Sequence, residues 1–207
     1  GVIREATFVT LHDSVHALTP ESVEVITRWM ALSNNRSPVL IGPGMSQAES
    51  AGRFLDAFLT SVGADLVGRL LVDADGLNLL AKRDNWPTLL PAGTILTPHD
   101  GEMSRLTRSS LRDVQRDHIG IALRFAAEWG HIVLLKGPHT VVAEPGGRAV
   151  VMPFANPAMA TAGTGDVLAG CITGLLGQGL APFSAAICGA YLHGKAGERW
   201  RAAHGEA

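Results

Sequence analysis

The stretch from Asn156 to Leu176 reads NPAMATAGTGDVLAGCITGLL, and we expect the rest of the chain to supply the walls around it. A glycine-broken loop leads here directly into an apolar helix, and Asp166 lies at the junction. The first amide groups of a helix have no partner within the helix, and together with the helix dipole they form a binding site for phosphate. Because the residues after Asp166 are nearly all small and apolar, we expect this helix to be buried, with its positive end aimed at a ligand.

Asp166 adds a carboxylate beside this anion site. A carboxylate does not favour simple phosphate binding, but it suits the handling of a hydroxyl proton or of a magnesium ion. The alternative is that Asp166 only caps the helix, since aspartate is favoured at helix starts. Gly163 and Gly165 can adopt backbone angles that other residues avoid, which lets an anion approach the main chain closely.

Length and composition predict one globular domain over residues 1–207. The chain has 207 residues, 46% of them hydrophobic, and a formal net charge of -2, which suits a single substantial core. Lysine and arginine are scattered, so no basic stripe favours nucleic acid or a membrane surface. No apolar run is long enough to span a bilayer, and the first residues lack the apolar core of a signal peptide. We therefore expect a soluble, cytoplasmic protein.

The two cysteines, Cys171 and Cys188, both lie in small apolar helical stretches. We predict buried thiols in a reducing compartment rather than a disulfide. No spacing of cysteine and histidine resembles a zinc site.

Short apolar strands, each followed by polar or glycine residues, recur along the chain. Their apolar residues are continuous rather than alternating, and helices separate them, so they predict an α/β fold with a mainly parallel sheet covered on both faces. Ligands of such sheets gather at the carboxyl ends of the strands. The strands expected on this basis are Val39 to Ile41, Leu70 to Val72, Thr94 to Leu96 and Ile132 to Leu135.

Capping residues and turn signals predict the remaining elements. A capping box of Ser46 and Glu49 begins one helix, and Glu144 to Gly147 turns a small β-hairpin. The further elements expected are a strand from Thr7 to Leu11, helices from about Pro20 to Leu32, Asp113 to Trp129 and Pro182 to Ala203, and hairpin strands from Thr140 to Ala143 and Ala149 to Met152.

Several polar residues at the strand ends are candidates for ligand binding. Lys136 is placed either to reach nucleotide phosphates or to stand as a solvated lysine. His99 lies in a loop, where a neutral imidazole binds a substrate amide or hydroxyl, although a single loop histidine more often has no such role. Asp73 and Asp75 act on magnesium-bound water or cap the helix after them, and we favour capping for Asp75.

Five motifs resemble, in order and spacing, the ADP-dependent NAD(P)H-hydrate dehydratase family, the carbohydrate-kinase-like domain of the ribokinase superfamily. The resemblance covers the chain from about residue 35 onward and implies a ribokinase-like three-layer sandwich, with a mainly parallel sheet flanked by helices and a small β-hairpin. The motifs are Ile41 to Gly44, Val72 to Asn78, Thr97 to Glu102, Leu135 to Gly137 and Asn156 to Asp166, and the segment Tyr191 to Gly194 is also similar.

The resemblance implies a metabolite repair reaction. Hydrated NADH or NADPH, called NADHX and NADPHX, would be dehydrated with ADP, or ATP, as co-substrate together with Mg2+, giving AMP and phosphate. Asp166 would be catalytic, because it would accept the proton of the substrate hydroxyl as this attacks the terminal phosphoryl group. No residue is predicted as a direct metal ligand. Gly44, His99 and Asp166 would contact the substrate, and Lys136, Gly137, Pro138, His139, Thr140, Gly163, Thr164 and Gly165 would contact the nucleotide.

The resemblance also implies a homo-oligomer and a fused or separate NAD(P)H-hydrate epimerase. Two departures from the family pattern stand out. Asp100 replaces a usual proline and adds negative charge near His99, and about a quarter of the expected domain is absent upstream, which predicts an unpaired sheet edge.

Two alternative functions stay open. A small-molecule kinase of the same superfamily, acting on a thiazole or pyrimidine alcohol, would use the same corner around Asp166. The motif from His99 to Glu102 favours the dehydratase over this kinase. A nucleotide-binding or assembly module without catalysis is the other alternative, and the absent upstream segment motivates it.

Overall fold

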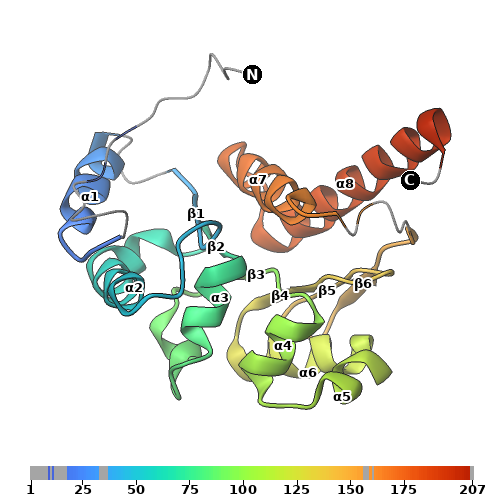
Figure 1. The fold of residues 1–207 in the computed structure, drawn as a ribbon, viewed down its shortest axis with the longest axis horizontal. Helices are drawn as coiled ribbons and strands as arrows, with labels where there is room; N and C mark the ends of the chain where they lie inside the picture. Colours follow the sequence, from blue (N-terminus) through green and yellow to red (C-terminus); the bar gives the residue numbers. More distant parts are fainter. Residues whose placement is uncertain are drawn as a thin grey trace.

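A computed structural model describes residues 9, 11, 18–32, 37–155, 159 and 161–205. In this part of the chain, strands form one mixed sheet with the spatial order β1-β2-β3-β4-β5-β6, and helices cover its faces (Figure 1). The strands are β1 (Val39–Ile41), β2 (Leu70–Val72), β3 (Ile95–Leu96), β4 (Ile132–Leu135), β5 (Val141–Ala143) and β6 (Ala149–Val151). The α-helices are α1 (Ser22–Leu32), α2 (Glu49–Val62), α3 (Ala74–Leu80), α4 (Asp100–Thr107), α5 (Leu111–Arg116), α6 (His118–Trp129), α7 (Thr164–Gly177) and α8 (Pro182–His204).

The sheet is parallel from β1 to β4, and the predicted mainly parallel arrangement is confirmed. Its central register places Ile95 between Leu71 and Ile132. Every residue of β2, β3 and β4 is buried, as expected for strands covered on both faces. Strands β5 and β6 run antiparallel as a hairpin, which is also confirmed. The strand predicted from Thr7 to Leu11 lies outside the described residues.

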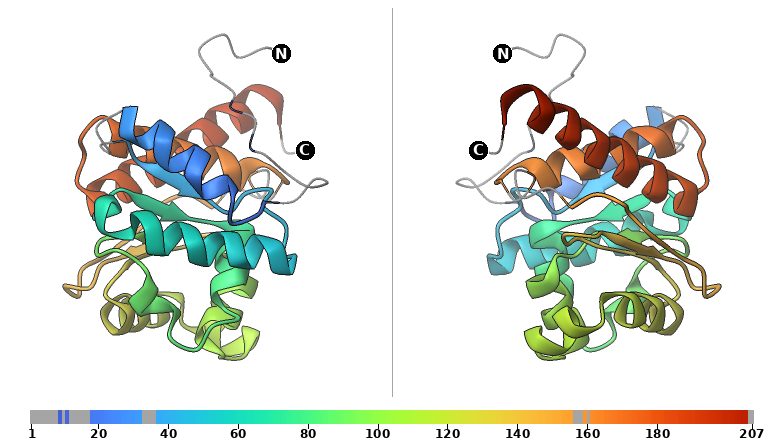
Figure 2. Two further views of the ribbon diagram at one scale, coloured as in Figure 1. Left: turned by 90° about the vertical axis from the view of Figure 1, so that its left-hand side faces the viewer. Right: turned by 90° about the vertical axis from the view of Figure 1, so that its right-hand side faces the viewer.

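Alternate residues of each strand feed two apolar cores, because successive side chains point to opposite faces of a sheet. Leu70 and Val72 belong to the core that the sheet shares with α1 to α6. Leu71, between them, belongs to the core shared with α7 and α8. The two helical layers lie on either side of the sheet (Figure 2), so the predicted three-layer sandwich is confirmed.

Strand β1 lies at one edge of the sheet and pairs with β2. The described residues give it no second partner strand, in agreement with the expected unpaired edge. Among the helices of the described ranges, none is both long enough and apolar enough to traverse a bilayer.

Two local predictions about helices are wrong. The helix expected from Asp113 to Trp129 is two helices, because Asp117 separates them and its side chain accepts a hydrogen bond from the amide of Gly120. Ser46 does not cap α2, since the helix begins only at Glu49.

Burial was also overestimated in α7 and at both cysteines. Helix α7 buries Leu168 and Ile172, but Val167 in its first turn is 65% exposed. Cys188 is exposed and Cys171 is only half-buried. Small apolar residues look the same in a sequence whether a helix is covered on one side or all round, which is why composition misled here.

Candidate active site

A cavity of about 750 Å3 opens where β2, β3 and β4 end and α7 begins. This is the edge at which ligands of parallel sheets are expected. The side chains that matter for its chemistry come from strand ends far apart in the sequence and from α7 and α8. They are Asp73, His99, Glu102, Lys136, Thr164, Asp166 and His193, with apolar walls from Met152, Phe154 and Leu168.

The start of α7 forms one wall of the cavity. Gly163 holds the N-cap position with a φ of 89°, in the left-handed region that favours glycine, and no side chain caps the helix. The Thr164 hydroxyl oxygen lies 2.7 Å from the carbonyl oxygens of both Met159 and Thr161, so its single hydrogen is shared between them and holds the turn before the helix. Gly165 is helical and needs no special backbone angle, contrary to the prediction. Residues 156–158 and 160 of the same motif lie outside the described residues.

Asp166 lies in the first turn of α7, is exposed and lines the cavity. The interpretation of Asp166 as a cap is wrong, because Gly163 occupies the cap and no side chain bonds there. Within the described residues the Asp166 carboxylate has no hydrogen-bond or ion-pair partner. It is therefore free to accept a proton from a ligand hydroxyl.

A buried charge cluster forms the floor of the cavity. The ammonium of Lys136 lies 2.7 Å from Oδ1 of Asp73 and 3.7 Å from Oε2 of Glu102. The side chain of Lys136 is 20% exposed, that of Asp73 is 2% exposed and that of Glu102 is 5% exposed. Two nearly buried carboxylates thus share one cation, which compensates them. The alternative of a solvated lysine is therefore wrong, because Lys136 forms ion pairs with Asp73 and Glu102 inside the cavity.

His99 is the N-cap of α4. Its Nδ1 accepts hydrogen bonds from the amides of Gly101 at 2.9 Å and Glu102 at 3.3 Å, and Glu102 in return accepts from the His99 amide at 2.9 Å. The pair forms a capping box with histidine in the place of serine. Because Nδ1 is an acceptor here, the neutral ring carries its hydrogen on Nε2. The His99 side chain is 54% exposed and lines the cavity, and its Nε2 also lies 3.4 Å from Oε1 of Glu102.

The structure brings most of the predicted residues together, but not all. Gly137, Pro138 and Thr140 line the cavity, whereas His139 does not, and its Nδ1 lies 3.2 Å from the carbonyl of Met152. Gly44 is also absent from the cavity lining.

Asp75 is not the helix cap that we favoured. Asp73 holds the N-cap position of α3, and its side chain makes no capping bond. The Asp75 carboxylate instead accepts hydrogen bonds from the amide of Ser46 and from the side chain of Gln47, at 3.0 Å each. Asp75 therefore fastens the loop after Gly44 onto α3.

Sequence reasoning missed His193, which lines the cavity from α8. Burial lowers the pKa of His193, and a hydrogen bond with the backbone of Thr164 partly opposes this shift. Sequence reasoning also missed the pairing of Glu102 with Lys136. The spacing of His99 and Glu102 could have revealed the capping box, but nothing local to His193 points to α7.

Protein side chains by themselves supply few grouped metal ligands in the part of the chain that the structure describes. In the described part of the chain, no three or more histidine, cysteine, aspartate or glutamate residues are grouped to hold an ion. Asp73 and Glu102 do offer the carboxylate oxygens that Mg2+ prefers, and Mg2+ commonly takes one or two carboxylates together with phosphate oxygens. The donor set therefore fits Mg2+ that arrives with a nucleotide.

Comparisons with known proteins agree with this geometry. A family model described as NAD(P)H-hydrate dehydratase matches residues 2–207. The chain is 46% identical, over 76% of its length, to a bifunctional NAD(P)H-hydrate repair enzyme of Moorella thermoacetica, and 36% identical, over 89%, to that of Escherichia coli. It spans only 29% and 33% of those two relatives. A solved ADP/ATP-dependent NAD(P)H-hydrate dehydratase of Bacillus subtilis, co-crystallised with ATP and Mg2+, is 30% identical with a TM-score of 0.68, covering 90% of this chain and 69% of that one.

Proposed function

The chain belongs to the NAD(P)H-hydrate dehydratase family, and from that premise we propose that it dehydrates NADHX and NADPHX back to NADH and NADPH. ADP is the proposed co-substrate, with ATP as the alternative, and the products are AMP and phosphate when ADP is used. One observation carries the proposal: the unpartnered carboxylate of Asp166, the Nε2 of His99 and the start of α7 border the same cavity.

The proposed chemistry has two steps. Asp166 accepts the proton of the substrate hydroxyl while the hydroxyl oxygen bonds to the terminal phosphorus of the nucleotide, and AMP leaves from ADP. The loop from Gly163 to Gly165 and the first turn of α7 stabilise the negative charge on the phosphoryl oxygens. Phosphate then leaves from the ring together with a ring proton, because phosphate is a far better leaving group than hydroxide. This elimination restores the dihydronicotinamide.

Further residues have supporting roles in this proposal. Gly44 and His99 contact the hydrated nicotinamide, with Nε2 on the half-exposed ring of His99 as the donor. Lys136 to Thr140 contact the nucleotide, and for His139 we assign this contact to its backbone because its ring is turned toward Met152.

We assign Mg2+ to the nucleotide phosphates, with Asp73 and Glu102 as the protein carboxylates that would hold it. Bound there, Mg2+ would neutralise charge on the phosphates. A relative that was co-crystallised with ATP and Mg2+ supports Mg2+ as the ion that accompanies the nucleotide.

We also propose that residues 1–207 act as one catalytic domain of a cytoplasmic homo-oligomer, and that an epimerase works with it, fused or separate. The bifunctional repair enzymes among its relatives support the epimerase partner.

The test is a product assay. The purified protein is incubated with NADHX, ADP and Mg2+, and we expect dihydronicotinamide absorbance to return while AMP and phosphate form in equal amounts. A stable phosphorylated alcohol, formed from a thiazole or pyrimidine alcohol and ATP, would favour the kinase alternative instead. Nucleotide binding without turnover of NADHX, with ADP and with ATP, would contradict the proposal and favour the non-catalytic module.

A further inference from the structure

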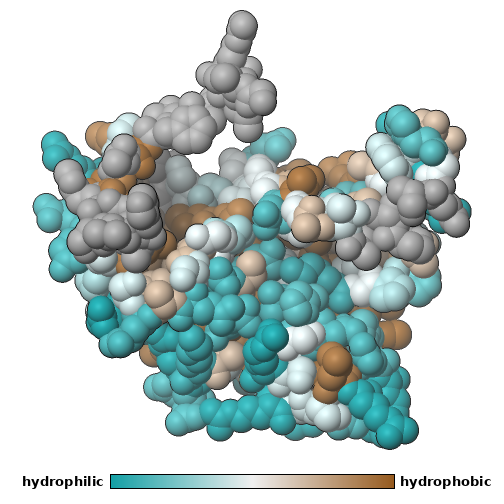
Figure 3. All heavy atoms as spheres, in the orientation of Figure 1, coloured by the Kyte–Doolittle hydropathy of each residue, from teal (hydrophilic) through white to brown (hydrophobic). Residues whose placement is uncertain are grey.

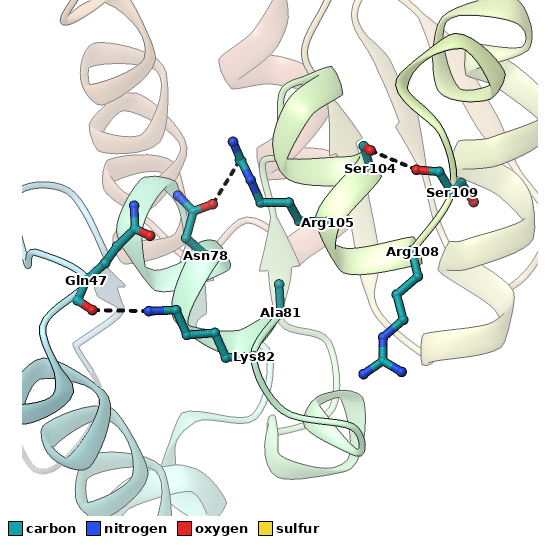
Figure 4. Close-up of a pocket in the computed structure, with 8 residues that line it drawn as sticks. All are labelled: Gln47, Asn78, Ala81, Lys82, Ser104, Arg105, Arg108 and Ser109. Atoms are coloured by element: carbon teal, nitrogen blue, oxygen red, sulfur yellow. Dashed lines mark hydrogen bonds between the residues drawn. The ribbon is translucent and has the colours of Figure 1, made fainter.

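A second cavity, of about 490 Å3, lies between α3 and α4, and we call it the α3–α4 groove (Figure 4). It opens to solvent, because its charged side chains are exposed. Three of the side chains that line it are cationic and none is acidic. The lining residues are Gln47, Asn78, Ala81, Lys82, Ser104, Arg105, Arg108 and Ser109.

Two of the three cations have only neutral partners. Nη1 of Arg105 donates to the side-chain carbonyl of Asn78 at 3.0 Å, and Nζ of Lys82 donates to the backbone carbonyl of Gln47 at 3.1 Å (Figure 4). Neither has a carboxylate partner among the residues that the structure describes. Arg108, in contrast, forms an ion pair with Asp84. Lys82 and Arg105 therefore hold uncompensated positive charge and spare donors, which suits phosphate.

The groove is joined to the loop in which we predict a substrate contact. Gln47 lies three residues after Gly44, and Asp75 on α3 fastens its side chain and the amide of Ser46. The bond from Lys82 to the Gln47 carbonyl adds a third tie between this loop and α3. Together these bonds fix the position of this loop relative to α3.

The groove also begins close to the active-site cavity, because both share α3 and α4. On α3, Ala74 lines the cavity and Asn78 lines the groove. On α4, Glu102 lines the cavity and Arg105 lines the groove. With a rise of about 1.5 Å per residue, each step along the helix axis is only about 4 to 6 Å. A ligand longer than a mononucleotide can bridge the two.

Building on the proposed function, we propose that the α3–α4 groove binds the phosphate groups of the dinucleotide substrate that lie beyond its first phosphate. NADHX and NADPHX are long polyanions, and only the hydrated ring reacts at Asp166. The rest of the molecule must extend along the protein, and Lys82 and Arg105 match its charge. The groups in question are the second phosphate of the diphosphate and, in NADPHX, the 2′-phosphate of the distal ribose.

The test uses the double variant K82Q/R105Q. Its matched control is R53Q/R124Q, which also removes two exposed cations, each engaged in a helical ion pair away from the groove. For K82Q/R105Q we expect KM for NADHX and NADPHX to rise about tenfold with kcat unchanged, because the groove does not touch the reacting atoms. Hydrated reduced nicotinamide mononucleotide, which ends at the first phosphate, should be turned over equally by the variant and the wild type.

The two dinucleotides distinguish the phosphate involved. A larger rise in KM for NADPHX assigns the groove to the 2′-phosphate, and equal rises assign it to the diphosphate. Unchanged KM for both dinucleotides, or an equal rise in R53Q/R124Q, overturns the proposal while leaving the dehydratase activity established.

Direct binding separates this inference from the proposed function. Titration calorimetry with NADP+ and with nicotinamide mononucleotide requires no turnover. We expect K82Q/R105Q to weaken NADP+ binding about tenfold and to leave mononucleotide binding unchanged. If the wild type does not bind NADP+, or both proteins bind it equally, the groove has no such role, whether or not NADHX is turned over.

Discussion

The ammonium of Lys136 lies 2.7 Å from a carboxylate oxygen of Asp73, 63 positions earlier in the sequence. This ion pair joins the end of β4 to the end of β2 across the floor of the cavity. The Asp73 side chain is only 2% exposed, so the nearby ammonium offsets the loss of hydration of its carboxylate. The arrangement of the active-site floor therefore depends on Lys136 for stability as well as for any ligand contact.

Replacing Lys136 by methionine should destabilise the protein by about 3 kcal/mol, because two nearly buried carboxylates lose their shared cation. The free energy of unfolding is measured by urea titration. The control Arg124→Met removes an exposed pair with Glu128 and should change stability by less than about 1 kcal/mol. Equal losses in the two variants would show that the buried cluster is not stabilising.

Two glycines of one loop should respond differently to alanine. A Cβ at Gly42, where φ is 125°, would lie 1.8 Å from the carbonyl oxygen of Asp73, so Gly42→Ala should cost more than about 3 kcal/mol. At Gly44, where φ is 69°, a Cβ has open space, and only the backbone strain of about 1 kcal/mol remains. Thermal unfolding compares the two. Similar losses would contradict the close packing of this loop against the start of α3.

Substitutions of His99 should separate its two roles. His99→Ala removes the cap of α4 and should lower stability by about 1 kcal/mol, whereas His99→Asn supplies another capping acceptor and should keep it. Both lack the imidazole Nε2, so we expect kcat/KM for NADHX to fall at least about tenfold in both. The measurements are melting temperature and kcat/KM. Normal activity in His99→Asn would mean that His99 acts only as a cap.

Stability should fall on acidification because of the buried His131 and the half-buried His193. Burial lowers the pKa of His131, against a raising effect of its hydrogen bond to Pro87, and burial likewise lowers the pKa of His193. Below the ordinary pKa of 6.5 the unfolded chain therefore binds protons that the folded chain does not, and unfolding is favoured as the pH falls. Urea midpoints between pH 7.5 and about pH 5 check this trend. In His131→Gln the decline should be shallower, and an unchanged decline would exclude His131 as a source.

The architecture and the position of the candidate site could be predicted from the sequence, because both follow from local patterns. Continuous apolar strands between helices require a parallel sheet, and polar residues at their carboxyl ends then meet at one edge. The glycine loop before Asp166 likewise identified the start of α7. These signals are contained within short segments of chain.

The rest could not be predicted, because it depends on which distant segments become neighbours. The pairing of Lys136 with Asp73 and Glu102 requires the order of β2, β3 and β4 in the sheet. His193 reaches the cavity only because α8 packs against α7. The α3–α4 groove arises in the same way, from helices whose cations have no common motif.

Asp166→Asn tests the central claim most directly. The amide keeps the size of the side chain but cannot accept the hydroxyl proton, so we predict that kcat for NADHX with ADP falls about 1000-fold. The dissociation constant for ADP, measured in parallel by calorimetry, should stay within about twofold of the wild-type value, since each factor of ten corresponds to about 1.4 kcal/mol. Near-normal turnover together with intact ADP binding would contradict the assignment of Asp166 as the catalytic base.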